Sequence, residues 1–115
     1  MPPRNQWSAQ ERQARSRLAQ ILHDQEVIHG SVVRMARTCG KARCRCQQGE
    51  KHESPYLSIV LDGKRKMVYI PPELEDEVRQ RVAAYREVES LTEAVSAACV
   101  DRVLARKAQR KQDRP

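Results

Sequence analysis

The stretch that decides the fold is YLSIVLDGKRKMVYI, residues 56–70. Residues 56–61 and 66–70 are rich in β-branched and aromatic side chains, which is typical of strands. Between them lies Asp62-Gly63, and this dipeptide is the strongest short-range signal for a two-residue hairpin turn. The stretch therefore predicts two antiparallel strands joined at Asp62-Gly63.

Alternation of side chains divides this hairpin into two faces. Leu57, Ile59 and Leu61 share one face, and one face must cover a helix. We expect the other face to show Tyr56 or Tyr69 close to one of three basic residues. Tyrosine among basic side chains can lie on a nucleic-acid backbone or stack on a base. The alternative is that the tyrosines are half-buried sheet residues. The three basic residues are Lys64, Arg65 and Lys66.

Residues 31–37, upstream of the hairpin, predict a further strand because Val32 and Val33 are β-branched and the apolar residues alternate. With the hairpin it makes a three-stranded antiparallel sheet, and a cysteine-rich loop joins its first two strands. We predict irregular structure from that loop up to Pro55. The sheet region spans residues 30–71 and resembles a zinc knuckle in its composition.

Two helices are predicted to flank the sheet. Ser8 and Glu11 match a capping box at the start of an N-terminal helix over residues 8–29, and Gly30 is a good helix stop. Pro72 and the acidic residues after it begin a long C-terminal helix over residues 72–111. Residues 1–7 are expected to be disordered, and residues 112–115 form a tail. The fold class is α+β.

The long helix carries more apolar surface than a small sheet can cover. Its apolar residues recur every three or four positions, so the surplus must pack on the N-terminal helix, on a second copy or on a partner. Cys99 lies on this stripe and is interpreted as an apolar filler. Charged residues of the N-terminal helix, Glu11 and Arg15 among them, are expected on a solvated face.

The loop between the first two strands contains a candidate metal site. Cys39, Cys44, Cys46 and His52 follow the spacing Cys-x4-Cys-x-Cys-x5-His, and three thiolates with one imidazole form a common closed set for structural zinc. This spacing lacks the usual Cys-x2-Cys knuckle. The alternatives are reduced cysteines in a basic loop, or a disulfide from Cys39 to one of the other two. His23 and His29 are expected to be surface or capping residues, although His29 is close enough in sequence to replace His52 as a ligand.

Charge points to an anionic partner. The 115-residue chain has a net charge of +7 and a pI of about 9.6, which favours nucleic acid first and an anionic membrane surface second. Basic residues dominate 34–51 and 101–115, whereas three bases face seven acids over residues 73–93. Hydrophobic residues make up 39% and Phe is absent, so a large aromatic core is not available. The chain shows no membrane span or signal peptide, which predicts a cytoplasmic protein with reduced thiols.

A nucleic acid should therefore meet the loop, the tail or both, and we expect DNA in preference to RNA. Phosphate contacts need positive donors held at the spacing of a groove, and a rigid basic loop would supply them. The predicted contact residues are Arg34, Arg37, Lys41, Arg43, Arg45, Lys51, Tyr56, Lys64, Arg65 and Lys66.

Several of these motifs occur in one order: Cys39-Gly40-Lys41, Cys44-Arg45-Cys46, His52, Pro55-Tyr56 and Tyr69-Ile70-Pro71. In this order the chain resembles a family of small, uncharacterised bacterial and archaeal proteins that are often described as transposase-associated. The resemblance covers about residues 30–90. It implies a link with mobile elements and hence with DNA.

Three classes of function compete. The first is a zinc-binding, nucleic-acid-binding accessory protein, associated with a transposon or other mobile element, with one Zn2+ per chain. The second is a protein-interaction adaptor that forms a homodimer or docks a partner through the C-terminal helix. The third, an enzyme, is not expected, because the sequence has no paired carboxylates in a plausible cleft, no phosphate-binding glycine loop and no helical His-Glu-x-x-His.

Overall fold

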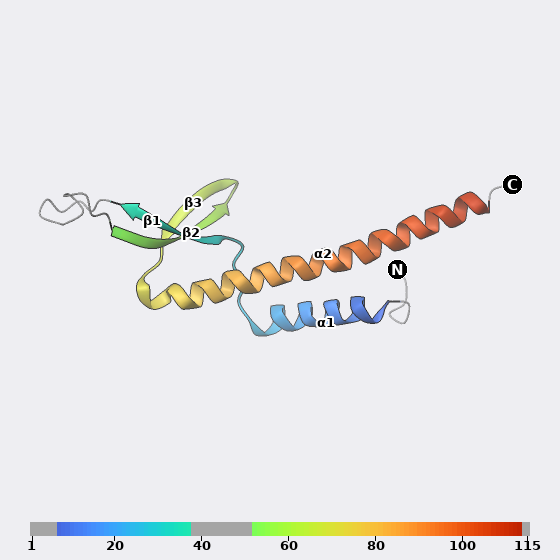
Figure 1. Ribbon diagram of the computed structural model, residues 1–115, viewed down its shortest axis with the longest axis horizontal. Coiled ribbons are helices and arrows are strands. Elements are labelled where there is room, and N and C mark those ends of the chain that lie inside the picture. The colour runs from blue at the N-terminus through green and yellow to red at the C-terminus, as the bar shows by residue number, and fades with distance from the viewer. Residues whose placement is uncertain (1–6, 38–51, 114–115) are drawn as a thin grey trace, which may run out of the picture. The chain divides into compact units, whose positions relative to one another are not determined.

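The structure is a computed structural model that describes residues 7–37 and 52–113. In chain order it contains α1 (Ala9–Asp24), β1 (Ser31–Arg37), β2 (His52–Leu61), β3 (Lys64–Tyr69), the 3-10 turn η3 (Pro72–Leu74) and α2 (Glu75–Gln112) (Figure 1). The predicted α+β fold, with a three-stranded antiparallel sheet between an N-terminal helix and a long C-terminal helix, is confirmed.

The chain divides into two compact units. One unit comprises Met1–Glu26 and Arg86–Pro115, and the other comprises Val27–Tyr85. The first contains α1 and most of α2, and we call it the helical unit. The second contains the sheet and the beginning of α2, and we call it the sheet unit. The described residues bury few apolar side chains: Ala14, Ile21, Ile70, Val82 and Ala84. This small core agrees with the low apolar content.

The sheet has the order β1-β2-β3, and both pairs are antiparallel. Asp62 and Gly63 have φ angles of 52° and 77°, and two consecutive positive φ values are the mark of a type I′ turn. This turn makes Leu61 the partner of Lys64. β3 therefore starts at Lys64, two residues before the predicted strand.

β2 starts at His52, so the prediction of irregular structure up to Pro55 is wrong. Proline is unusual in a central strand because it lacks an N–H to donate. Here the Pro55 carbonyl accepts a hydrogen bond of 3.0 Å from the Ile70 N–H, just beyond the end of β3. The N and O of one strand residue point to the same side. The missing N–H therefore faces the end of β3, where no strand residue remains to accept it.

α1 begins as predicted but ends earlier. The Ser8 hydroxyl caps it by accepting a hydrogen bond of 3.1 Å from the Glu11 N–H. The helix ends at Asp24 instead of continuing to residue 29, and Gln25 is extended. In the sheet unit the Ile28 N–H donates to the Arg81 carbonyl at 3.1 Å, and the His29 ring stacks on Tyr85. These contacts hold residues 28–29 in a non-helical segment.

α2 is a continuous helix of 38 residues that follows the turn Pro72–Leu74. At 1.5 Å per residue it is about 57 Å long. Glu75, Asp76 and Glu77 occupy its first turn, and Arg110 and Lys111 occupy its last. Both groups complement the helix dipole; the sequence predicts this for the acidic first turn.

Candidate nucleic-acid interface

One face of the sheet carries a row of side chains across all three strands. Val33 pairs with Tyr56, and Tyr56 pairs with Tyr69. The two tyrosine rings meet edge to face, with centroids 5.8 Å apart and planes at 66°. Tyr69 is 51% exposed, whereas Tyr56 is half-buried. An open aromatic ring therefore stands on this face, next to a ring that supports it.

Arg65 shares the face with the tyrosines. The strand register places Ser58 and Met67 in the next row, and Val60 and Arg65 in the row after that. The Arg65 Nη1 donates to the buried Ser58 hydroxyl at 2.6 Å, so its guanidinium lies across the sheet towards the tyrosines. We name Tyr56, Tyr69 and Arg65 the aromatic-arginine face.

Lys64 and Lys66 do not join this face. Their partners Leu61 and Ile59 belong to the opposite face by alternation. Of the three basic candidates Lys64, Arg65 and Lys66, Arg65 therefore lies on the face of the tyrosines, and Lys64 and Lys66 lie on the other face.

The opposite face carries the expected apolar residues. Leu57 and Ile59 are half-buried, whereas Leu61 is 48% exposed. Arg34 belongs to this face and forms an ion pair of 3.3 Å with Glu75, in the first turn of α2. Arg79 contacts the same carboxylate at 2.9 Å. Arg34, a predicted phosphate contact, is therefore already paired with the carboxylate of Glu75.

The predicted metal ligands lie mainly outside the described residues. This applies to Cys39, Cys44 and Cys46, and also to the loop cations Lys41, Arg43, Arg45 and Lys51. Residues 7–37 and 52–113 contain no group of three or more side chains that could hold a metal ion.

The backbone of Arg37 and His52 shows where the loop is attached. Arg37, the last residue of β1, pairs with His52, the first residue of β2. The two residues that flank the segment 38–51 in sequence therefore lie side by side at one end of the sheet. The backbone of the predicted ligand His52 lies at this end of the sheet, paired with Arg37. Cys39, the first predicted cysteine ligand, follows Arg37 by two positions in the sequence.

The two other histidines are placed by the structure. The His29 ring stacks on Tyr85, with centroids 4.4 Å apart and planes at 14°. The His23 side chain is 88% exposed and lies 3.9 Å from Asp24, in the last turn of α1. Both lie on the surface, as the sequence predicts.

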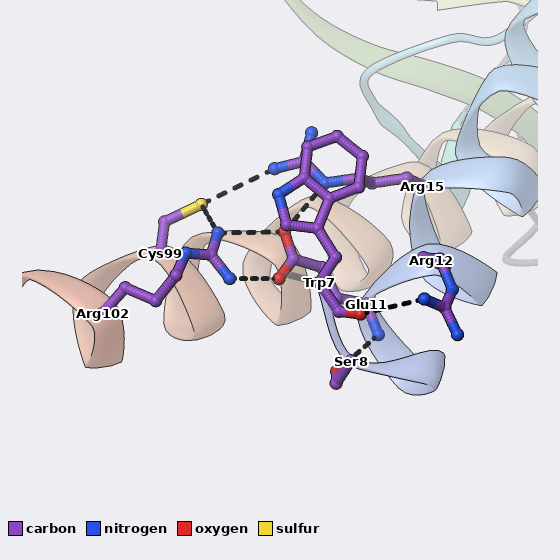
Figure 2. A network of polar contacts seen from close by, with 7 residues as sticks. All are labelled: Trp7, Ser8, Glu11, Arg12, Arg15, Cys99 and Arg102. Atoms are coloured by element: carbon purple, nitrogen blue, oxygen red, sulfur yellow. Dashed lines mark hydrogen bonds and ion pairs between the residues drawn. The ribbon is translucent and has the colours of Figure 1, made fainter. Parts of the chain in front are cut away.

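A buried carboxylate between α1 and α2 is a feature that the sequence analysis missed (Figure 2). Glu11 is 4% exposed, which corrects its prediction as a solvated residue. Arg102 donates from both terminal nitrogens to the two carboxylate oxygens, at 2.5 and 3.1 Å, and Arg15 Nε donates at 2.8 Å. The hydrogen bond from Arg102, followed by that from Arg15, lowers the pKa of Glu11 from 4.5 to about 2, against the opposing effect of burial.

Cys99 belongs to the same network, so its interpretation as an apolar filler is wrong. Its sulfur lies 3.3 Å from Arg102 Nη2 and 3.7 Å from Arg15 Nη2. The Arg15 guanidinium also lies over the Trp7 ring, 3.8 Å from the centroid (Figure 2), in the range of a cation–π contact. Arg12 Nη1 donates to the Trp7 carbonyl at 3.2 Å. These contacts fasten the start of α1 to α2.

No sequence signal identifies this network, because Glu11 and Arg102 are 91 residues apart. The network has a structural role, because it joins α1 to α2. The Glu11 carboxylate accepts three hydrogen bonds from two guanidinium groups, and its lowered pKa makes it a poor base.

Comparison with protein families places part of the chain in a family. The family described as "Domain of unknown function (DUF6788)" matches residues 6–80, a stretch that includes α1, the sheet and the first turns of α2. No curated protein and no solved structure matches the chain. In the part of the chain that the structure describes, no helix is long and apolar enough to cross a membrane. Because the match covers more than half of the chain, the protein belongs to this family of unknown function.

Proposed function

We propose that this protein is a small, non-enzymatic nucleic-acid-binding accessory protein in which zinc holds the basic loop. The aromatic-arginine face is the observation that carries this proposal. A half-exposed ring and a guanidinium on the same sheet face offer a surface for stacking a base and a donor for its phosphate. Base stacking of this kind tolerates any sequence, because every base has a π face.

Charge supports the same function. A net charge of +7 attracts polyanions over the distance of a Debye length and releases counterions on binding. The acidic residues at the start of α2 would repel phosphate, so the contact surface lies on the sheet and on the basic loop. Within the sheet, Arg65 is better placed than Arg34, because Arg34 is paired with Glu75.

The pairing of Arg37 with His52 supports a zinc site in the loop. Because the sheet already joins the two ends of the segment, a metal ion has less chain entropy to remove when it gathers the three cysteines. Zinc would fix the loop cations in one arrangement, and His52 would be the nitrogen ligand. DNA is the proposed nucleic acid, in the setting of a mobile element, on the resemblance carried by the cysteine, histidine and tyrosine motifs.

The binding surface can be tested with Tyr69→Ala and a matched control, Val68→Ala. The two residues are neighbours on β3, similarly exposed at 51% and 45%, and they point to opposite faces. Fluorescence anisotropy with labelled single-stranded DNA, duplex DNA and RNA, over a series of salt concentrations, gives the affinities. Loss of one stacked base costs about 1–3 kcal/mol, or roughly 5–150-fold in Kd.

We expect Tyr69→Ala to weaken binding by this factor and Val68→Ala to leave it nearly unchanged, with the two variants equally folded by circular dichroism. Equal affinities for the two variants would remove the sheet face from the proposal. Absence of salt-dependent binding to all three nucleic acids would refute the function itself.

Zinc can be tested independently by elemental analysis of protein purified without chelator. Cys44→Ser should lose the metal, whereas Cys99→Ser, whose sulfur contacts Arg15 and Arg102 in the helical unit, should retain it. Wild-type protein without metal would refute the zinc site and leave the sheet-face experiment standing.

A further inference from the structure

α2 has two different faces within the helical unit. One face is covered by α1, through the contacts of Glu11 with Arg102 and of Arg17 with Glu87, the second at 2.8 Å. Glu11 in α1 contacts Arg102 in α2, whereas Arg17, further along α1, contacts Glu87, which comes earlier in α2. The two helices therefore run antiparallel. Val88, Leu91 and Val95 are half-buried on this side. The predicted apolar stripe of α2 is therefore largely used inside one chain.

The opposite face of α2 is exposed over its whole length in this unit. From Glu89 onwards, at about 100° per residue, nine exposed residues fall within an arc of roughly 120°. Arg86, at the start of this unit, is exposed within the same arc. We call the nine residues the outer stripe. Val100, Val103 and Leu104 in its middle are 51%, 63% and 56% exposed. The outer stripe consists of Glu89, Glu93, Ser96, Ala97, Val100, Val103, Leu104, Lys107 and Lys111.

The order of residues along the outer stripe is self-complementary. It runs from acidic through small and apolar to basic. If two copies cross at Val100 in opposite directions, Glu93 lies opposite Lys107, and Glu89 lies opposite Lys111. The same register sets Ala97 against Val103 and Ser96 against Leu104, so that a smaller side chain faces a larger one on each side of the central Val100 pair. A parallel pair would instead set each charge against the same charge.

We propose that α2 binds α2 of a second copy of this chain, antiparallel along the outer stripe and centred on Val100. Three neighbouring apolar residues, each about half exposed or more, form a patch that association would cover. The apolar centre supplies most of the attraction, because exposed ion pairs are individually weak. The ion pairs fix the direction in which the two helices run. The two-fold symmetry makes the interface isologous.

A second copy fits the outer stripe better than other occupants do. Nucleic acid would bind Lys107 and Lys111 but would be repelled by Glu89 and Glu93. An unrelated helix would have to present acidic, small, apolar and basic residues in this same order, running antiparallel to α2. A second copy of this chain presents that order without any further requirement. The inference uses residues 89–111, beyond the family match at residues 6–80, and it does not depend on the proposed function.

Association can be measured by sedimentation velocity in a reducing buffer without nucleic acid, from micromolar to millimolar protein. We expect wild type to form dimers and Leu104→Glu to remain monomeric. Lys107→Glu should raise the dimer Kd roughly tenfold, because it turns two attractive contacts into repulsive ones. Arg106→Glu is the matched control: it makes the same change in charge at the adjacent exposed residue, off the outer stripe. A wild-type protein that stays monomeric, or equal effects of Lys107→Glu and Arg106→Glu, would overturn the proposal.

The direction of pairing can be tested with a double variant, Glu93→Lys with Lys107→Glu. In the antiparallel register this variant restores both ion pairs with its own copy and repels the wild type. Fluorescence energy transfer between labelled chains should therefore show homodimers of each protein and few mixed dimers at low salt. The preference should fade near 1 M salt, where the Debye length is about 3 Å. A preference for mixed dimers would contradict the antiparallel arrangement.

Discussion

Ile21→Ala provides the sharpest test of what holds α1 in place. Ile21 is 1% exposed and is the largest fully buried side chain of the described residues. Replacing a buried Ile with Ala removes apolar contacts and leaves a cavity, which costs about 2–5 kcal/mol. The few buried apolar residues of this chain make that loss a large part of its total stability.

Leu22→Ala is the natural control. Leu22 is the next residue of the same helix, but it is 54% exposed. Its loss should change the free energy of unfolding by no more than about 0.5 kcal/mol, as for most surface substitutions. Both variants end as alanine in α1, so helix propensity does not separate them.

Thermal unfolding followed by circular dichroism measures the difference. For a chain of this size each kcal/mol corresponds to about 3–6 °C in Tm, so Ile21→Ala should lower Tm by roughly 6–30 °C and Leu22→Ala by less than about 3 °C. Urea unfolding should show the same order in the free energy of unfolding. If the two variants lost the same stability, the packing of α1 described above would be wrong.

Two further predictions concern buried polar and backbone contacts. Because its folded pKa of about 2 lies below the ordinary 4.5, Glu11 should contribute stability that is present above pH 4.5 and is lost as the pH falls towards 2. In Glu11→Gln the midpoint of urea unfolding should therefore depend less on pH between pH 6 and 3 than in the wild type. An unchanged pH dependence would contradict the network. A Cβ at Gly30 would lie 2.7 Å from the Ser58 carbonyl oxygen and 2.8 Å from Ile59 Cγ2, so Gly30→Ala should cost about 1–3 kcal/mol in urea unfolding, and a neutral effect would refute this close approach.

The sheet could be predicted because its signals are local. Asp62-Gly63 specifies a turn by itself, and the alternation of residues 56–61 fixes which side chains share a face. Ser8 likewise identifies the start of α1, since its capping contact lies three residues away. Tyr56 and Tyr69 could be placed on one face once the turn fixed the register.

Long-range contacts decided what the sequence could not predict. The carboxylate of Glu11 resembles any surface residue of a helix until Arg102, 91 positions later, reaches it. The hydrogen bonds from Ile28 to Arg81 and from Ile70 to Pro55 likewise join residues that are distant in the sequence. The register of β2 with β3 decides which of Lys64, Arg65 and Lys66 lies with the tyrosines, and it places Arg65 there.

β3 has a consequence for solubility that is separate from binding. It is an edge strand whose six residues are all exposed, and a free strand edge is a template on which copies of a protein aggregate. Lys64, Arg65 and Lys66 place three like charges on half of this edge, which repel a second β3 before it can pair. Like charges on this edge therefore act against edge-to-edge pairing of the sheet, whatever else the cations bind. Neutralising them would leave a short edge with Met67, Val68 and Tyr69, the composition of an aggregation-prone segment.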